Sequence, residues 1–224
     1  MTIKRLIPII QLDGDYQAVK TIQFRDRIYI GDPLNLIKIY NDLGVDEVAL
    51  LNIDSRVNKS PTCLTILRDL AAEARMPLTY GGGLQSMDEV QEIISYGFEK
   101  ISFSMSTFNK SELPSLVVKR FGLSAVQAVL NVKKNLFGKY NAYCHVTNTN
   151  IGPMLKGIEQ LISYGCGEIL IQLVNKDGTR SGLDLDLINQ LDFDLRTPLI
   201  LSGGLSTHQE AITVLNRHNL SGIA

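Results

Sequence analysis

The sequence predicts an α/β fold of the (β/α)8 TIM-barrel type, in which eight parallel strands are each followed by a helix. Short β-rich runs alternate with segments of helical periodicity along the whole chain. The chain also resembles itself, because Gly82-Gly83-Leu84 recurs 121 positions later as Gly203-Gly204-Leu205. Such a repeat predicts one domain over residues 1–224, made of two half-barrels at about residues 1–121 and 122–224.

Each predicted element takes its place in this alternation. Gly44 and Gly165 each separate a helical pattern from the hydrophobic strand that follows. The strands are predicted at residues 5–11, 47–53, 77–80, 100–104, 125–131, 168–173, 198–201 and 221–224. The helices are predicted between them at residues 34–43, 64–75, 87–96, 113–120, 154–164, 183–191 and 207–216.

The count of elements favours a closed barrel. Strict alternation implies parallel pairing with right-handed crossovers. An open Rossmann sheet is the alternative, but a G-x-G-x-x-G is absent after the first predicted strand. Because the last strand reaches Ala224, we expect the eighth helix to be missing from this sequence, either because the protein continues or because its last unit is incomplete.

Composition excludes several classes of protein. The 224 residues carry 22 Lys and Arg against 23 Asp and Glu, with no basic run longer than a doublet, which argues against a nucleic-acid binder. The longest apolar runs span about five residues, against roughly 18 for a membrane span. Three scattered cysteines fit a cytoplasmic protein, and neither they nor the three histidines show metal-ligand spacing. We expect no metal and no cofactor.

Two glycine-rich turns mark the expected site. In a barrel of this kind the site lies at the C-terminal ends of the strands. The third and seventh predicted strands end in Gly82-Gly83 and in Ser202-Gly203-Gly204. Backbone N–H groups at such turns bind phosphate, so we expect a phosphorylated small molecule with two phosphate ends. The alternative is that the glycines only allow tight turns.

Two further segments could take part in binding. Residues 175–182 contain Lys176 and Arg180, which could attract a phosphate, and Thr179 and Ser181, which could donate hydrogen bonds to it. A solvated mobile loop is the alternative. The long stretch 12–31 after the first strand is predicted to be a lid.

Several short sequence segments, spread along the whole chain, together resemble one family. The chain is similar to the cyclase subunit of imidazole glycerol phosphate synthase, a barrel of histidine biosynthesis. The matching phrases are Lys4-Arg5-Leu6-Ile7-Pro8, Val19-Lys20, Gly31-Asp32-Pro33, Gly44-Val45-Asp46-Glu47-Val48 and Ser202-Gly203-Gly204, with the runs 80–84 and 177–182.

The resemblance implies two catalytic aspartates, at the ends of the first and fifth strands. This sequence has Gln11 and Asn131 there. An amide cannot exchange a proton near neutral pH, and each lost acid or base costs about 10²- to 10⁴-fold in rate. Asp13 is a possible substitute if the strand extends, because it would share a face with Gln11.

Other positions matched by the resemblance are partly changed. Where the family has an acidic residue at the end of the second strand, this sequence has Asn52, with Asp54 two residues beyond. Where the family has a hydroxyl-and-amide pair at the end of the fourth strand, this sequence has Ser104-Met105. The phosphate-binding residues implied in the second half, by contrast, keep their identities. They are Asp177, Gly178, Thr179, Gly203 and Gly204.

At the opposite end of the barrel, the resemblance implies an ammonia gate. The four charged positions of the gate correspond to Arg5, Glu47, Lys100 and Glu168, and each residue has the same sign of charge as in the family. Glu99 matches a position that contacts the partner, a glutaminase subunit that docks on the N-terminal face to form a heterodimer. The alternative is a salt-bridge ring that only stabilises the barrel.

Three functions stay open. The preferred one is a cyclase-like barrel that pairs with a glutaminase subunit and receives or passes ammonia with weak or no cyclase activity, as in relatives that serve surface-polysaccharide sugar amidation. The second is a genuine cyclase subunit of histidine biosynthesis. The third is a non-catalytic scaffold that binds a phosphosugar.

Overall fold

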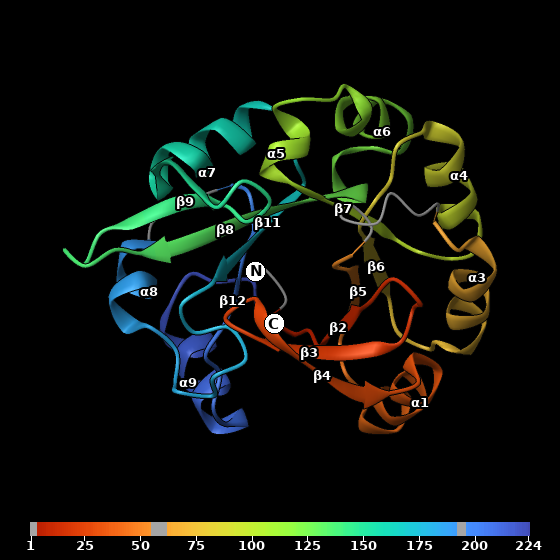
Figure 1. Cartoon of the computed structure of the whole chain (residues 1–224), viewed down its shortest axis with the longest axis horizontal. Coiled ribbons are helices and arrows are strands. Elements are labelled where there is room, and N and C mark those ends of the chain that lie inside the picture. Colours follow the sequence, from red (N-terminus) through yellow and green to blue (C-terminus); the bar gives the residue numbers. More distant parts are fainter. Residues whose placement is uncertain (1–3, 55–61, 192–195) are drawn as a thin grey trace.

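The chain folds as a barrel in which one sheet curls on itself and helices cover the outside (Figure 1). The computed structural model describes residues 4–54, 62–191 and 196–224. Its sheet has the order β1-β13-β12-β11-β8-β7-β6-β5-β2-β3-β4. Because β1 and β2 are successive pieces of the first predicted strand, their pairing with β13 and β5 closes the sheet. The predicted barrel is confirmed.

The barrel strands lie close to the predicted positions. The first strand is interrupted at Ile7 and Pro8, since proline has no N–H to donate to a ladder. All neighbouring barrel strands pair in parallel. Their bounds are β1 Arg5–Leu6, β2 Ile9–Leu12, β5 Val48–Asn52, β6 Leu78–Gly81, β7 Lys100–Ser104, β8 Val126–Lys134, β11 Glu168–Leu173, β12 Leu199–Ser202 and β13 Gly222–Ile223.

In the described residues, seven helices connect these strands, as predicted. The first shows why the helices begin and end where they do: the Asp32 side chain accepts a hydrogen bond from the Leu34 N–H, Pro33 starts the helix, and Gly44 ends it at φ 62°. A short helix, α5 (Met105–Phe108), and a 3-10 turn, Leu123–Ala125, were not predicted. The connecting helices are α1 Pro33–Leu43, α3 Leu64–Glu73, α4 Met87–Ser95, α6 Leu113–Phe121, α7 Met154–Ser163, α8 Leu185–Leu191 and α9 His208–Arg217.

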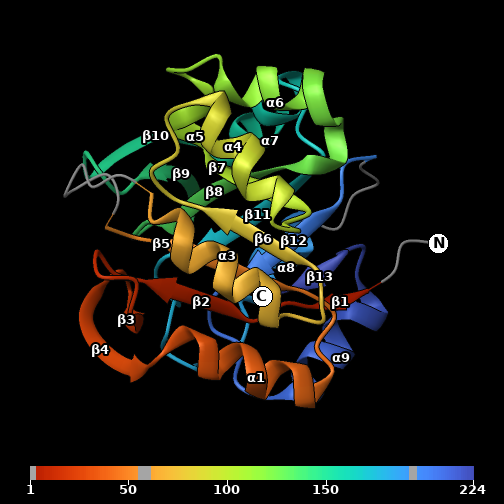
Figure 2. The same ribbon diagram turned by 90° about the vertical axis from the view of Figure 1, so that its right-hand side faces the viewer.

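Two antiparallel hairpins extend the sheet beyond the barrel, both at the C-terminal ends of strands (Figures 1 and 2). The stretch expected to be a lid contains β3 (Ala18–Ile22) and β4 (Arg25–Gly31), and β3 pairs with β2. After β8, which extends three residues beyond its predicted end, β9 (Tyr140–Cys144) and β10 (Thr149–Pro153) form the second hairpin. This hairpin was not predicted.

The hydrophobic residues form two layers because successive side chains of a strand point to opposite faces. Leu50 and Ile171 belong to the large cluster shared with the helices. The residues beside them in the strands point into the barrel, where a smaller cluster contains Ile7, Ala49, Leu170 and Ile200. The barrel interior therefore contains an apolar cluster at mid-height, and polar groups gather at its two ends.

Among the residues that the structure describes, no helix is long and apolar enough to cross a bilayer.

Candidate functional site

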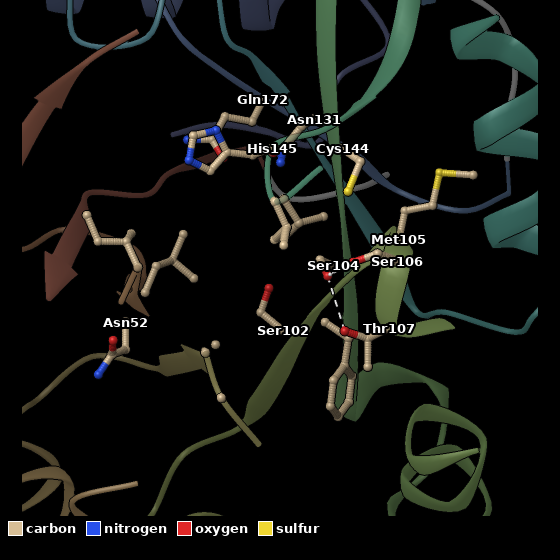
Figure 3. A pocket seen from close by; sticks show the side chains of 18 of the residues that line it. Asn52, Ser102, Ser104, Met105, Ser106, Thr107, Asn131, Cys144, His145 and Gln172 are labelled. Carbon is tan, nitrogen blue, oxygen red and sulfur yellow. Dashed lines mark hydrogen bonds between the residues drawn. The ribbon is translucent and has the colours of Figure 1, made fainter. Parts of the chain in front are cut away.

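A cavity of about 810 Å³ opens at the C-terminal end of the barrel. Five barrel strands supply polar side chains to its wall: Gln11, Asn52, Ser104, Asn131 and Gln172. The last four are labelled in Figure 3. The described residues that line the cavity include no aspartate or glutamate. The five strand-end side chains are therefore amides and a hydroxyl, which form hydrogen bonds but do not transfer protons near neutral pH.

Gln11 is held by the first hairpin. Its Oε1 accepts hydrogen bonds from the backbone N–H and from the hydroxyl of Thr21, both at 3.0 Å. Thr21 lies in β3, which pairs with β2 at Gln11 and Val19. The amide thus fixes the hairpin against the cavity wall and stays neutral.

Asn131 lies beside Gln172, because β8 and β11 pair in register at these residues. Both side chains line the cavity. The Asn131 Oδ1 atom is buried and has no hydrogen-bond partner among the described residues. Because buried polar atoms are nearly always paired, this carbonyl oxygen is an exception among the described residues.

Asp13 does not take the place of a catalytic acid in this structure. Strand β2 ends at Leu12, and Asp13 Oδ1 accepts hydrogen bonds from the N–H groups of Asp15 at 3.0 Å and Gln17 at 2.9 Å. It therefore closes a local turn, and it is not among the residues that line the cavity. Because β2 ends at Leu12, the condition under which Asp13 could share a face with Gln11 is not met.

Asp54 is also engaged. Its carboxylate is 5% exposed and forms a two-point ion pair with Arg27 of β4. It accepts a further hydrogen bond from the Gly14 N–H at 3.1 Å. Asn52 Oδ1 in turn accepts a hydrogen bond from the Asp54 N–H. The acid next to Asn52 therefore anchors the first hairpin, and Arg27 lines the cavity in its place.

The predicted phosphate residues of the first half come together in the cavity. Gly82, Gly83 and Ser104 all line it. Gly82 has φ 127°, and a Cβ there would lie 2.4 Å from the Asn52 carbonyl oxygen, so only glycine fits. The Ser104 hydroxyl lies 2.9 Å from that of Ser106 and 3.1 Å from that of Thr107 (Figure 3).

The predicted phosphate residues of the second half lie outside this cavity. Loop segments hold one another there: the Gly182 N–H donates to the Gly204 carbonyl at 2.8 Å, and Lys176 Nζ donates to the Gly182 carbonyl at 2.8 Å. The Thr179 hydroxyl donates to the Lys176 carbonyl at 2.8 Å. None of the following lines the cavity: Asp177, Gly178, Thr179, Ser202, Gly203 and Gly204.

Asp177 lies behind the cavity wall. Its oxygens are 3.4 Å from the Thr21 hydroxyl and 3.4 Å from Gln172 Nε2, two groups that do line the cavity. Burial raises the pKa of the Asp177 carboxyl, and the bonds from Gln172 and Thr21 only partly oppose this. Its backbone also holds the first hairpin, because the Gln23 N–H donates to the Asp177 carbonyl at 2.9 Å.

The second hairpin adds cavity residues that were not predicted: Tyr143, Cys144 and His145. At its turn, the His145 ring meets Phe24 of the first hairpin edge to face, with ring centroids 5.1 Å apart. Burial lowers the pKa of His145. In β9 the buried residues Tyr140 and Ala142 alternate with less buried neighbours, as in a strand with one covered face.

At the opposite end, the four predicted charges form a closed ring of ion pairs. Glu47 accepts from Arg5 at 2.6 Å and from Lys100 at 2.7 Å. Glu168 accepts from Arg5 at 2.7 Å and lies 3.1 Å from Lys100. Both acids are buried, so the compensation by two cations is what permits their charge. Glu99 is exposed beside the ring.

Burial alone would raise the pKa of the Glu168 carboxyl. Lys100 and Arg5 outweigh burial, with help from a hydrogen bond donated by Gln127, and hold the pKa below the ordinary glutamate value of 4.5. The Glu168 carboxylate is therefore charged whenever the barrel is folded near neutral pH.

A line of hydrogen bonds connects the ring with the cavity. Gln127 Nε2 donates to Glu168 Oε1 at 2.8 Å, and Ser102 Oγ donates to Gln127 Oε1 at 2.9 Å. Gln127 is 1% exposed, and Ser102 lines the cavity. Register places the three side chains together, because Gln127 pairs with Ser102 on one side and with Glu168 on the other.

Comparison with known proteins agrees with this architecture. A family model described as "Histidine biosynthesis protein" matches residues 5–224. The putative imidazole glycerol phosphate synthase subunit hisF3 of Vibrio vulnificus (strain YJ016) is 33% identical over 98% of this chain and 85% of its own length. A putative subunit HisF of Leptospira borgpetersenii is 33% identical over 98% and 87%. The subunit HisF of Sulfolobus acidocaldarius is 31% identical over 96% and 86%.

The charge ring makes the stability of the barrel depend on pH. Because the folded pKa of Glu168 lies below its ordinary value of 4.5, its stabilisation is present above that pH and is lost as the pH falls through the folded pKa. We predict that the free energy of unfolding, measured with urea between pH 6.5 and 3, falls more steeply for the wild type than for Glu168→Gln. The exposed neighbour provides the control: Glu99→Gln keeps the wild-type slope. Parallel slopes for the wild type and Glu168→Gln would contradict the role of the ring.

The contact between the first hairpin and the loop after β11 depends on Gly178. Its φ is +70°, and a Cβ would lie 2.1 Å from the Thr21 carbonyl oxygen. Gly138 has a similar φ of +75°, but a Cβ there meets nothing within 4 Å. We predict that Gly138→Ala costs about 1 kcal/mol of unfolding free energy and that Gly178→Ala costs at least about 2 kcal/mol more. Equal urea midpoints for Gly178→Ala and Gly138→Ala would contradict this prediction, because they would show that the first hairpin and the loop after β11 separate without cost.

Proposed function

The chain belongs to the histidine biosynthesis protein family, and from this premise we propose that it is a cyclase-subunit-like barrel with weak or no cyclase activity. In this proposal the barrel pairs with a glutaminase subunit, docked at its N-terminal face, and receives or passes the ammonia that the partner releases. The site at the other end binds a phosphorylated small molecule.

The replacement of both implied acid/base groups by amides carries the proposal. Gln11 and Asn131 line the cavity and cannot exchange protons near neutral pH. Nearby acids are engaged elsewhere: Asp13 closes a turn and Asp54 pairs with Arg27. Losing both groups costs about 10⁴-fold or more in rate if each contributes about 10²-fold. A cavity changed in this way is better suited to binding a ligand than to catalysing closure of the imidazole ring.

The charge ring supports the pairing with a glutaminase. Arg5, Glu47, Lys100 and Glu168 have the charge signs of the family's gate, and four ion pairs join them in a closed ring. Ammonia is small and both donates and accepts hydrogen bonds. The bonded line from Glu168 through Gln127 to Ser102 offers such groups from the ring to the cavity. Movement of the flexible Lys100 side chain would open the ring.

The glycine turn of the first half supports a position for the ligand. We propose that a phosphate binds at Gly82, Gly83 and Ser104, where the backbone comes close to the cavity. A second phosphate end would need the loops of the second half to separate, with Lys176 leaving the Gly182 carbonyl. Delivery of ammonia to a separate enzyme that amidates a surface-polysaccharide sugar fits a barrel that does not consume it, and this destination rests on the family resemblance.

Reconstitution with a purified glutaminase subunit from the same organism tests the proposal. We predict that glutamine hydrolysis rises when the barrel is added, while no imidazole glycerol phosphate forms from the ribulosyl aminoimidazole substrate. The matched variant Gln11→Asp/Asn131→Asp restores the two carboxylates and is predicted to raise cyclisation by at least about 10²-fold. Normal cyclase turnover by the wild type would make the chain a genuine cyclase subunit. Absence of any glutaminase stimulation would favour a phosphosugar-binding scaffold.

A further inference from the structure

The turn between β8 and β9 carries the two most exposed large apolar side chains of the described residues. Leu136 is 102% exposed and Phe137 is 89% exposed, so neither packs against the rest of the protein. Figure 1 shows that this turn projects beyond the layer of helices. Single exposed apolar residues are common on protein surfaces, but two adjacent ones at a projecting turn indicate a contact surface. We call residues 135–139 the hairpin tip.

The hairpin tip has a fixed backbone. The Asn135 N–H donates to the Lys139 carbonyl at 2.9 Å, and the Gly138 N–H donates to the Asn135 carbonyl at 3.0 Å. The Asn135 Oδ1 atom also accepts from the N–H groups of Phe137 at 2.9 Å and Lys139 at 3.0 Å. These bonds hold the backbone of the two apolar residues at the outermost part of the turn, so a partner does not have to order the turn on binding.

Positive charges flank the apolar pair. Lys139 is exposed on one side of the pair, and the half-buried Lys133 lies on the other. Lys134, by contrast, lies 3.3 Å from the carboxylate of Asp184 and 3.2 Å from that of Asp186, which compensate its charge. The tip therefore combines two apolar side chains with two lysines, and this combination is complementary to an anionic surface that has an apolar interior.

The size and shape of the tip favour a lipid surface over a protein. Phe137 can bury at most roughly 250 Å² and Leu136 less, whereas a stable protein interface buries roughly 800 Å² on each partner. A lipid bilayer needs no matching surface, because its interface is fluid. Its acyl chains can receive the two apolar side chains while its phosphates attract the lysines.

We propose that the hairpin tip docks the barrel on the surface of an anionic lipid bilayer. Leu136 and Phe137 enter the interface, and Lys133 and Lys139 lie among the lipid phosphates. This contact is peripheral, because two side chains enter the lipid and no helix crosses it.

The proposed contact lies at the end of the barrel where the cavity opens. Strand β8, which leads into the tip, contributes Asn131 to the cavity wall, and the exposed Lys110 also lines the cavity. The charge ring lies at the opposite end. Docking on a bilayer therefore neither requires a glutaminase partner nor competes with one, and the inference stands apart from the proposed function.

Sedimentation of the whole chain with lipid vesicles tests the proposal. The probes are vesicles of phosphatidylcholine alone and vesicles in which about one third of the lipid is phosphatidylglycerol, both at low ionic strength. We expect the protein to bind the anionic vesicles at least about tenfold more tightly than the neutral ones. Lys133→Gln/Lys139→Gln and high salt should each weaken binding to the anionic vesicles at least about threefold.

Removal of the apolar pair provides the second arm. Leu136→Ser/Phe137→Ser should weaken binding to the anionic vesicles at least about tenfold. The matched control is Ile39→Ser/Leu43→Ser in α1, which replaces two side chains that are 51% and 68% exposed and should leave binding unchanged. Far-ultraviolet circular dichroism checks that each variant is folded.

A fluorescent reporter locates the contact. The chain contains no tryptophan, so Phe137→Trp places a single indole at the tip and Leu43→Trp places one on α1. We expect anionic vesicles to shift the emission of Phe137→Trp to shorter wavelength and to leave that of Leu43→Trp unchanged.

Three results would overturn the proposal. The first is no binding of the wild type to anionic vesicles, and the second is equal binding by the wild type and Leu136→Ser/Phe137→Ser. The third concerns a second copy of the chain as the occupant of the tip: sedimentation equilibrium without vesicles would show a wild-type dimer that this double variant converts to a monomer.

Discussion

The compensated charge ring at the floor of the barrel is the constraint on which the rest of the structure depends. Two buried carboxylates and two cations meet where four strands begin, and removal of one member would leave an unpaired buried charge. The ring fixes the starts of strands whose other ends carry the cavity. It also holds Gln127, which orients Ser102 at the cavity floor.

The C-terminal end of the barrel, which carries the cavity, departs from the family resemblance. Its wall contains amides where the family resemblance implies acids, and these amides act as structural groups: Gln11 holds Thr21 of the first hairpin, and Asn131 lies against Gln172. The neighbouring carboxylates are used to attach hairpins and loops. The N-terminal end of the barrel has all four charges that the resemblance implies, whereas the cavity wall lacks the two implied aspartates. This combination fits a barrel that passes ammonia better than one that consumes it.

Much of the fold could be predicted from the sequence, because the alternation of strands and helices is periodic and local. The hairpins could not be predicted. Strand β4, for example, is exposed along almost its whole length, so it does not alternate between buried and exposed positions. Asp13 was a possible substitute only if the first strand extended to it, and β2 ends one residue earlier, a boundary that local sequence does not determine. The residues predicted to bind phosphate in the second half lie outside the cavity, where a tertiary contact between Gly182 and Gly204, which no local pattern predicts, holds their loops together.

The affinity between the barrel and a glutaminase subunit tests the central claim most directly, since the claim places the partner on the face that carries the ring. Isothermal titration calorimetry can compare Glu99→Arg, beside the ring, with Lys110→Gln, at the opposite mouth. The account predicts that Glu99→Arg weakens binding at least about tenfold and that Lys110→Gln leaves it unchanged. Weakening by Lys110→Gln alone, or no binding by the wild type, would contradict it.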